Sequence, residues 1–508
     1  MLCFKKAALI SAIFGSLAFL NESSAAGVSF YVDSSRAANG NGSASNPWQL
    51  LSHIDWTVIS NNLNSADVRL YMSSRASWSP PNQAFTPGAS GTASHRFYVI
   101  GDEFWNTNAT GTAVWNAETG NGRARLDGGA NFALPGGMRY FTGKGLYIYH
   151  PLWSCIVMGV QLPTTNVYEI AVYNCVGDSP INSHGVAGDY LSTGCSNILV
   201  SGCTFSNTIG EAIYMCPFDD LTGHVGGIIL ESNLFVNCGL GGQGEMDIKP
   251  PCTGAIIRYN RHLRTASGLG GANCGVVIGA DNCQVYGNII HNCQTEVGGG
   301  WGCGIFVNSD GDGAGTGKAV HSCLIYNNLI YANMQAGIKM TAGTSTIGAD
   351  VSGIQIWNNT IWGNSMSGID IEASNGRSIT IAALKNNIIG GNANYDINLS
   401  GTVTLSACDY NLYYRVSGNS WSVNNSGRTW AQWRALGFDS NGLSSPPQFV
   451  DAAHFNFDLQ TNSPALRLGV PSSLFNTDLR QNLRPAFAWD LGALQAVPAA
   501  PKNLVIIQ

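Results

Sequence analysis

The sequence predicts an all-β fold in which the chain winds as a coil of parallel strands. Three observations predict it. An asparagine motif occurs six times, at intervals of 27, 28, 40, 31 and 28 residues. A short strand motif with alternating apolar positions comes before each asparagine, and no helical periodicity lies between them. A repeat of this length indicates stacked supersecondary units. The repeat is clearest over residues 202–411, and we assign the repeat body to residues 151–411.

The asparagine is the second residue of short motifs such as Ser-Asn-Leu-Phe and Gly-Asn-Ile-Ile. Successive turns of a coil of parallel strands lie roughly 4.8 Å apart. Identical amide side chains on neighbouring turns can therefore hydrogen-bond along a column. The residues predicted to form this ladder are Asn233, Asn260, Asn288, Asn328, Asn359 and Asn387.

The strand motif has apolar residues at its second and fourth positions, whereas its first and third positions vary between glycine, aromatic and charged residues. This period of two predicts strands with one buried face and one solvated face. The motifs occupy residues 212–215, 245–248, 275–278, 304–307, 337–340 and 368–371. The pattern resembles the right-handed, single-stranded parallel β-helix of secreted pectate-lyase-like proteins. An ordinary sandwich or propeller is the alternative.

Residues 1–26 read as a secretory signal peptide. Lys5 and Lys6 precede an apolar run over residues 7–20, and Ser24-Ala25-Ala26 provides a small-residue cleavage site before Gly27. The run is too short for a membrane span. We expect a secreted or periplasmic protein with no transmembrane segment after cleavage.

Residues 27–150 are predicted to form the N-terminal cap and the first turns. Strands are expected over residues 30–33, 68–72 and 96–101, separated by turns rich in Ser, Pro and Gly. This order is similar to the opening block of secreted β-helix carbohydrate enzymes, which implies a carbohydrate-active protein.

Residues 412–495 resemble the C-terminal part of the same proteins. Because the last turn of a coil has an unpaired edge, we expect this segment to cover it. Residues 496–508 read as a linker and stub rather than a second domain.

Composition supports one long stacked body. Charged residues make up 11% of the chain, against a usual ~25%. The net charge of −6 without a basic run argues against nucleic acid as a partner. A monomer that binds a polysaccharide is expected.

Two cysteine pairs occupy equivalent places in neighbouring units. Cys274 and Cys303 each precede the glycine of a strand, and Cys283 and Cys323 each stand five residues before an asparagine. Neighbouring turns would place each pair within disulfide range. Disulfides and stacked buried thiols both remain open.

The candidate site follows from the strand motifs. Glycines at 275, 304, 337 and 368 predict a shallow channel, because glycine lets a ligand approach the backbone. Glu245, Asp247 and Lys249 alternate with apolar residues, so all three should point outward, roughly 6–7 Å apart. Lys339, Asp370, Glu372, Phe306 and Tyr214 should lie in the same outward columns.

The first predicted chemistry is β-elimination of a uronate polymer, in which a base takes the proton beside a neutralised carboxylate. The stretch from Glu245 to Lys249, followed by Arg258, resembles the lysine strand of calcium-dependent alginate and chondroitin lyases. Glu245 and Asp247 are hard-oxygen ligands for a divalent cation such as Ca²⁺ that would neutralise the carboxylate, and Lys249 or Lys339 would then be the base. The resemblance implies Arg258 in substrate binding. The sequence departs from that family where glycines stand at 242 and 244, and in having no arginine over residues 270–279.

The second predicted chemistry is glycoside hydrolysis by two carboxylates, Asp370 with Glu372 or Glu245 with Asp247. A non-catalytic glycan-binding protein is the third alternative. The low count of 25 Lys and Arg favours a weakly charged or neutral glycan. His184, His262, His291 and His321 stand beside turn residues and are assigned structural roles.

Overall fold

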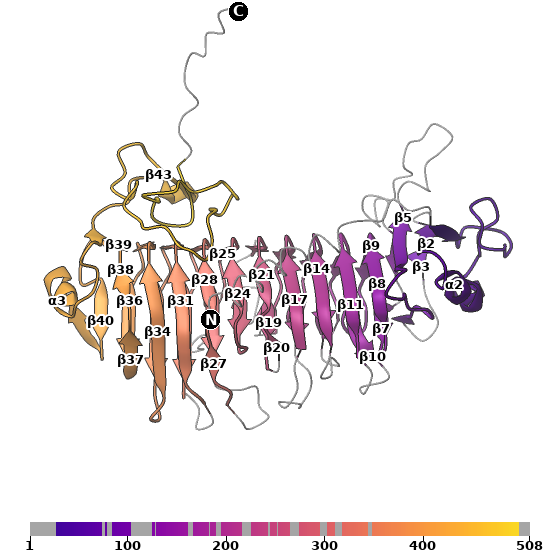
Figure 1. Cartoon of the computed structure of the whole chain (residues 1–508), viewed down its shortest axis with the longest axis horizontal. Coiled ribbons are helices and arrows are strands. Elements are labelled where there is room, and N and C mark those ends of the chain that lie inside the picture. Colours follow the sequence, from indigo (N-terminus) through magenta and orange to yellow (C-terminus); the bar gives the residue numbers. More distant parts are fainter. Residues whose placement is uncertain are drawn as a thin grey trace, which may run out of the picture.

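The computed structural model describes residues 27–496 except 74–76, 79–83, 103–123, 127–128, 161–165, 182, 189–194, 216–224, 242–243, 251, 265–273, 295–301, 310–316 and 344–347. The predicted signal peptide and residues 497–508 of the predicted stub lie outside the described residues. The protein is a parallel β-helix, as predicted: each turn contributes one strand to each of three sheets that run the length of the molecule (Figure 1).

Sheet 1 comprises the strand that opens each turn. Its strands, in spatial order, are β1 (Val28–Val32), β2 (Val68–Ser73), β5 (Phe97–Asp102), β8 (Arg139–Lys144), β11 (Tyr168–Tyr173), β14 (Ser196–Ser201), β17 (Val225–Glu231), β21 (Ile256–Arg258), β24 (Gln284–Tyr286), β28 (Leu324–Tyr326), β31 (Val351–Trp357), β34 (Ser378–Lys385) and β37 (Thr402–Leu405). Three short strands pair beside this path: β20 (Cys252–Thr253), β27 (Val320–His321) and β38 (Cys408–Asp409).

Sheet 2 follows sheet 1 in each turn. Its strands are β3 (Ser77–Trp78), β6 (Ala124–Leu126), β9 (Leu146–Tyr149), β12 (Val176–Asp178), β15 (Thr204–Ser206), β18 (Leu234–Val236), β22 (Arg261–Leu263), β25 (Ile289–His291), β29 (Leu329–Tyr331), β32 (Thr360–Trp362), β35 (Ile388–Gly390), β39 (Leu412–Tyr414) and β42 (Leu443–Ser444).

Sheet 3 completes each turn and carries the predicted strand motifs. Its strands are β4 (Ala84–Phe85), β7 (Asn131–Pro135), β10 (Ile156–Val160), β13 (Val186–Ala187), β16 (Ile213–Met215), β19 (Met246–Ile248), β23 (Val276–Ile278), β26 (Ile305–Asn308), β30 (Ile338–Ala342), β33 (Ile369–Ala373), β36 (Ile397–Ser400), β40 (Trp421–Val423) and β41 (Ser426–Arg428). Among the described strands of these three sheets, only β40 and β41 pair antiparallel.

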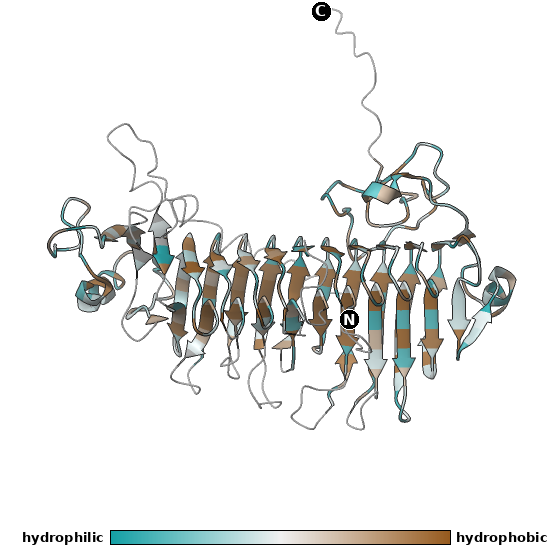
Figure 2. Cartoon of the chain, turned by 180° about the vertical axis from the view of Figure 1, so that it is seen from behind, coloured by the Kyte–Doolittle hydropathy of each residue, from teal (hydrophilic) through white to brown (hydrophobic). Residues whose placement is uncertain are grey.

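The core is a set of apolar columns that run through the middle of the coil. In sheet 1, Leu230, Ile257, Val285 and Ile325 are fully buried and stand in register on successive turns. Figure 2 shows the hydrophobic colour continuing from strand to strand along the stack. The period-two pattern of the sequence therefore builds one continuous core.

The predicted asparagine ladder is confirmed at the corner between sheets 1 and 2. The Nδ2 atom of each asparagine donates to Oδ1 of the next, at 3.0 Å from Asn233 to Asn260 and 3.1 Å from Asn359 to Asn387. The ladder continues through Asn411 and ends on the carboxylate of Asp439, 2.9 Å from Asn411 Nδ2. Each amide thus satisfies a polar group that burial would otherwise leave without a partner.

A second ladder, which was not predicted, occupies the corner between sheets 2 and 3. Asn333 donates to Asn364 and Asn364 to Asn392, each at 3.0 Å. Asn392 in turn donates to the carboxylate of Asp396, at 3.1 Å. Both ladders therefore end on a buried aspartate.

The prediction of a glycine-lined channel is wrong. An added Cβ would lie 2.4 Å from the Ile290 Cγ2 atom at Gly275, and 2.4 Å from the Ile330 Cγ2 atom at Gly304. These positions face the interior at the sheet 2–sheet 3 corner, where an isoleucine side chain fills the space. The glycines serve close packing in the core rather than approach of a ligand from outside.

Short helical elements lie at the two ends of the coil. At the N-terminal end, the 3-10 helix η1 (Leu51–His53) precedes α2 (Trp56–Asn62), whose first turn is capped by the Asp55 side chain. At the other end, α3 (Trp430–Ala435) packs its buried Trp433 against Trp421 of β40. No helix in the described part of the chain is long and apolar enough to cross a membrane.

Only the first part of the C-terminal segment, which includes α3, covers the last turn of the coil. After α3, the hairpin β43 (Phe449–Asp451) and β44 (Asn456–Leu459), with η3 (Ala452–His454) between them, turns back along the side of the coil (Figure 1). Val470, Leu474 and Phe475 then pack on the outer face of sheet 1. The expectation that the whole segment covers the open edge therefore needs correction.

Outward-pointing asparagines hold this segment in place. Asn327, Asn358 and Asn386 have positive φ angles between 50° and 60° and stand just before ladder residues. Their Nδ2 atoms donate to backbone carbonyls of Thr477, Asp490 and Val470. The Asn-Asn pairs of the sequence therefore mark the turns on which the C-terminal segment docks.

The twelve cysteines in the described residues are buried thiols. Cys274 and Cys303 lie in a small apolar cluster with Val277, Phe306 and Ala336, outside the main core. Of the two alternatives that the sequence left open, the structure has the stacked thiols.

Candidate functional site

The outer face of sheet 3 carries two columns of side chains in register, as predicted. The first column contains Ala187, Tyr214, Asp247, Val277, Phe306, Lys339, Asp370 and Asn398. The second contains Asn308, Thr341, Glu372 and Ser400, and Lys249 follows β19 on the same side. Tyr214 and Asp370 are five turns apart, or roughly 24 Å at ~4.8 Å per turn.

Lys249 joins two of the predicted residues into one cluster. Its Nζ atom lies 3.4 Å from Asp247 Oδ2 and 5.1 Å from the centre of the Tyr214 ring. The Asp247 side chain is 3% exposed and that of Lys249 is 22% exposed. A buried carboxylate thus holds a partly exposed ammonium against an aromatic face, where cation–π attraction adds to the ion pair.

A histidine and a glutamate that sequence reasoning did not select complete the cluster. His184 Nδ1 lies 2.7 Å from Glu211 Oε2, and the His184 ring stacks on Tyr214 with centroids 5.1 Å apart. Gly210 makes room, because a Cβ there would lie 2.6 Å from His184 Nδ1. The Glu211 carboxylate orients the imidazole through Nδ1, which the Glu211 backbone N also approaches at 3.2 Å. In the tautomer that donates its Nδ1 proton to this carboxylate, Nε2 is the basic nitrogen.

The sequence does contain a signal for this pair. His184 and Glu211 each stand two residues before a sheet 3 strand, 27 residues apart, and so occupy equivalent places on neighbouring turns. The structural role predicted for His184 rests on that residue alone, and the pair becomes visible only when the two repeats are aligned.

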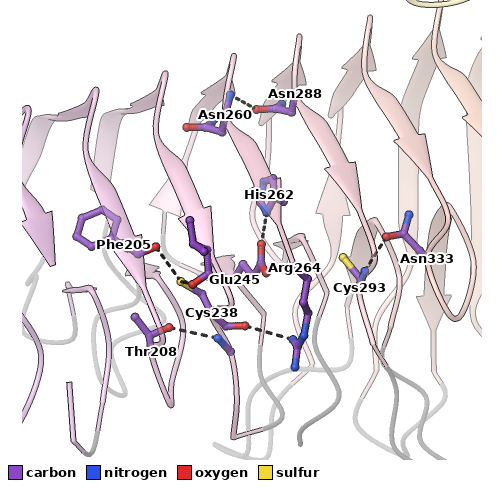
Figure 3. A network of polar contacts seen from close by, with 12 residues as sticks. Phe205, Thr208, Cys238, Glu245, Asn260, His262, Arg264, Asn288, Cys293 and Asn333 are labelled. Atoms are coloured by element: carbon purple, nitrogen blue, oxygen red, sulfur yellow. Dashed lines mark hydrogen bonds and ion pairs between the residues drawn. The ribbon is translucent and has the colours of Figure 1, made fainter. Parts of the chain in front are cut away.

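Glu245 does not belong to this outer cluster, contrary to the prediction. It precedes β19 at the corner position that glycine occupies on the next turn, where the backbone N of Met246 donates to the Gly275 carbonyl. Its side chain therefore turns inward and pairs with His262 Nδ1 from β22 (Figure 3). Both side chains are almost fully buried, at 2% and 1% exposed.

The calcium site predicted on Glu245 and Asp247 does not fit this geometry. The two carboxylates point to opposite sides of the strand, one to His262 in the core and the other to Lys249 outside. Within the described part of the chain, no group of three or more His, Cys, Asp or Glu side chains is arranged to hold a metal. Since Ca²⁺ takes six to eight oxygen ligands, we derive no step through a cation here.

The remaining predicted residues of sheet 3 lie on the correct face but at a distance. Lys339 is three turns beyond Asp247, roughly 14 Å at ~4.8 Å per turn, and its Nζ lies 5.8 Å from the Phe306 ring. Asp370 accepts a hydrogen bond from Asn398 Nδ2 at 2.8 Å, and Glu372 stands two residues further along β33. They form a second polar region of the same face.

Arg258 is not brought to either region. It ends β21 in sheet 1, where its Nε donates to Glu231 at 2.6 Å and its NH1 to the Tyr286 hydroxyl at 2.9 Å. Arg258 therefore lies on sheet 1, away from both regions of the sheet 3 face, and its role in substrate binding stays a prediction.

The sequence matches no known protein-family model and no curated protein. Among solved structures, XylC in complex with xylose is 9% identical over 92% of this chain and 98% of its own, with a TM-score of 0.48. Pectate lyase Pel9A is 14% identical over 92% and 96%, with a TM-score of 0.41. The periplasmic alginate epimerase AlgG is 11% identical over 70% and 76%, with a TM-score of 0.38. At these identities and scores the similarities do not assign an activity.

Proposed function

We propose that this protein is an exported polysaccharide lyase that cleaves a uronate-containing glycan by β-elimination on the outer face of sheet 3. The observation that carries the proposal is the cluster of His184, Glu211, Tyr214, Asp247 and Lys249. It brings an imidazole–carboxylate pair, a phenol and an ammonium together on one partly exposed surface. The predicted signal peptide supports export.

The reaction needs three functions that these residues can supply. His184 Nε2 takes the proton beside the uronate carboxylate, while Glu211 stabilises the imidazolium that forms. Lys249, as an ammonium, neutralises the carboxylate and so stabilises the developing negative charge. Tyr214 donates its hydroxyl proton to the departing glycosidic oxygen as the C–O bond breaks and the C=C bond forms.

This assignment revises the base. Lys249 was predicted to abstract the proton, together with Lys339 as an alternative. Because Asp247 lies 3.4 Å from its Nζ, Lys249 is better suited to the charged role, and Lys339 is three turns away. The neutral imidazole is a base near physiological pH.

Glycoside hydrolysis is the second candidate, and a specific observation favours it. Asp370 and Glu372 are both partly exposed and lie two residues apart on β33. This spacing is roughly 6–7 Å, at the lower limit of the ~6.5–9.5 Å typical of inverting enzymes. The other predicted pair, Glu245 with Asp247, does not support this chemistry, since Glu245 points into the core. Glycan binding without catalysis is the third candidate.

The test is an activity screen on uronate polymers and neutral glycans. Both new reducing ends and the ultraviolet absorbance of unsaturated uronate are followed. Lyase action gives both signals, and His184→Asn and Lys249→Met should each lower kcat by roughly 10²–10⁴-fold. The matched control is His321→Asn, since His321 forms an exposed pair with Asp281 elsewhere.

Three outcomes would contradict the lyase assignment. Reducing ends without absorbance, lost in Asp370→Asn, would establish the hydrolase. Absorbance that survives both His184→Asn and Lys249→Met would remove the proposed site. Binding without any product would favour the non-catalytic protein.

A further inference from the structure

We infer that the substrate is a heteropolysaccharide in which single uronate residues are flanked by neutral sugars, rather than an unbroken run of uronates. This inference rests on the proposed function and specifies the substrate class of the same site. It follows from the small number of Lys and Arg residues near the cluster, and from the uncharged side chains that the neighbouring turns place on the sheet 3 face.

Residues 150–317 supply the turns on both sides of the cluster and contain only four Lys or Arg residues. Arg258 pairs with Glu231 on sheet 1, and Arg264 is buried and donates to the Cys238 carbonyl. Arg261 begins β22 in sheet 2. Lys249 is therefore the single cation that this stretch of sequence places on the sheet 3 face.

Apolar side chains line the same face on either side of the cluster. Ala187 is the neighbour of Tyr214 on one side, and Val277 is the neighbour of Asp247 on the other, followed by Phe306. These three residues are 1%, 3% and 7% exposed, and Val277 and Phe306 belong to a buried apolar cluster. The column therefore offers no charged side chain between Asp247 and Lys339.

A run of consecutive carboxylates would be poorly accommodated along this column. Lys249 can neutralise one carboxylate, and the next cation on this face, Lys339, lies three turns beyond Asp247. Carboxylates in between would find no cation on the two intervening turns, and a charge that loses water without gaining a partner is costly. An isolated uronate with neutral neighbours avoids this cost.

The experiment compares two classes of polymer at equal uronate concentration. Polygalacturonate and polymannuronate represent consecutive uronates, and hyaluronan and unsulfated chondroitin represent uronates that alternate with neutral sugars. Initial rates from ultraviolet absorbance and reducing ends, and affinities from calorimetry with the His184→Asn variant, are measured on all four. We expect kcat/KM and affinity to be at least tenfold higher on an alternating polymer.

A charge-addition variant tests the cause directly. Asn308 lies on the Lys249 side of the face, in register with Thr341 and two turns beyond Lys249. Asn308→Lys should raise kcat/KM on polygalacturonate or polymannuronate severalfold relative to hyaluronan or chondroitin. Asn308→Gln keeps a neutral amide and should leave this ratio unchanged.

The outcomes separate the inference from the proposed function. A higher rate or affinity on either homopolyuronate would overturn the inference while the lyase assignment stands. Cleavage of an alternating polymer without absorbance would support the inference about charge and overturn the lyase assignment. Absence of binding and cleavage on all four polymers would overturn both.

Discussion

At the scale of single residues, the least expected feature is the buried pair of Glu245 and His262 inside the coil. His262 occupies a column whose neighbours are Phe235 and Ile290, and Glu245 aligns with Gly275 on the next turn. Burying two ionisable groups is costly even when they are paired. The pair places a carboxylate of β19 inside the core, directly behind the strand that carries Asp247.

We expect that Glu245 and His262 can be replaced together at little cost, but not one at a time. Glu245→Ala or His262→Phe alone should cost about 3–5 kcal/mol, because each leaves a buried ionisable group without its partner. The double variant should cost much less than the sum, since it restores the apolar pattern of the neighbouring turns. Denaturant unfolding of the four proteins measures this coupling. Additive losses would show that the two side chains act independently.

At the scale of elements, both asparagine ladders depend on the carboxylate at their end. Asp439 accepts hydrogen bonds from Asn411 Nδ2, the Tyr413 hydroxyl at 2.8 Å and Trp433 Nε1 at 2.9 Å. A carboxylate has two acceptor oxygens and no donor, so it can end a column of amides and also tie the end cap to it.

Asp439→Asn should destabilise the C-terminal end of the coil. The amide nitrogen cannot accept the hydrogen bonds of Tyr413 or Trp433, and leaving such buried donors unsatisfied costs about 1–3 kcal/mol. Thermal unfolding followed by tryptophan fluorescence measures the loss. Asp281→Asn removes the charge from an exposed pair with His321 and keeps an oxygen for the His321 backbone N–H, so it should change stability by less than about 1 kcal/mol. Equal effects of the two substitutions would contradict the role of Asp439.

The second ladder predicts a pH dependence of stability. Burial raises the pKa of Asp396 to about 7, only partly opposed by hydrogen bonds from Asn392 and Ser420. The unfolded value is ~3.9, so the folded state holds this proton more tightly. The resulting stabilisation is fully present below about pH 4 and is lost as the pH rises through about 7.

Asp396→Asn should remove this dependence, because the amide still accepts from Asn392 but carries no charge. Relative to the parent, the variant should gain about 4 kcal/mol in its free energy of unfolding as the pH rises from 4 to 8. Urea titrations at several pH values measure the difference. Asp451→Asn, at an exposed position, is the control. A difference that stays constant with pH would contradict the raised pKa of Asp396.

At the scale of the whole molecule, the C-terminal segment protects a side of the coil. Leu324, Tyr326, Trp357 and Ala383 form an apolar cluster on the outer face of sheet 1, covered by Val470, Leu474 and Phe475. Arg484 reinforces this docking, since its NH2 donates to Asn327 Oδ1 at 2.9 Å. The open end itself is covered by α3 and its aromatic neighbours.

Deletion of residues 446–508 should therefore leave the coil folded but self-associating. The end cap remains, whereas the apolar cluster on sheet 1 becomes exposed, and exposed apolar patches promote association. Circular dichroism and light scattering after size exclusion test both parts. A chain lacking only residues 497–508 should stay monomeric, and an unfolded deletion variant would contradict this division of roles.

Sequence reasoning succeeded where one residue type repeats along a column. The register of the asparagines and the alternation within the strands are local and periodic, so the pattern in one turn predicts the pattern in the next. Reasoning failed at the corners, where period two breaks: it placed Glu245 outside and the glycines in a channel. It also missed His184 with Glu211, since a pair becomes visible only when two turns are aligned.

The sequence by itself determined the coil, the main ladder and the two outer columns of sheet 3, because in-register stacking follows directly from periodic spacing. Only the tertiary structure decided which side chains meet. The direction of a side chain at a corner depends on how the backbone turns between two sheets, and contacts such as His184 with Tyr214 or Asn327 with Arg484 join residues far apart in the chain. The spacing of residues along one strand predicts neither the direction of a corner side chain nor these contacts.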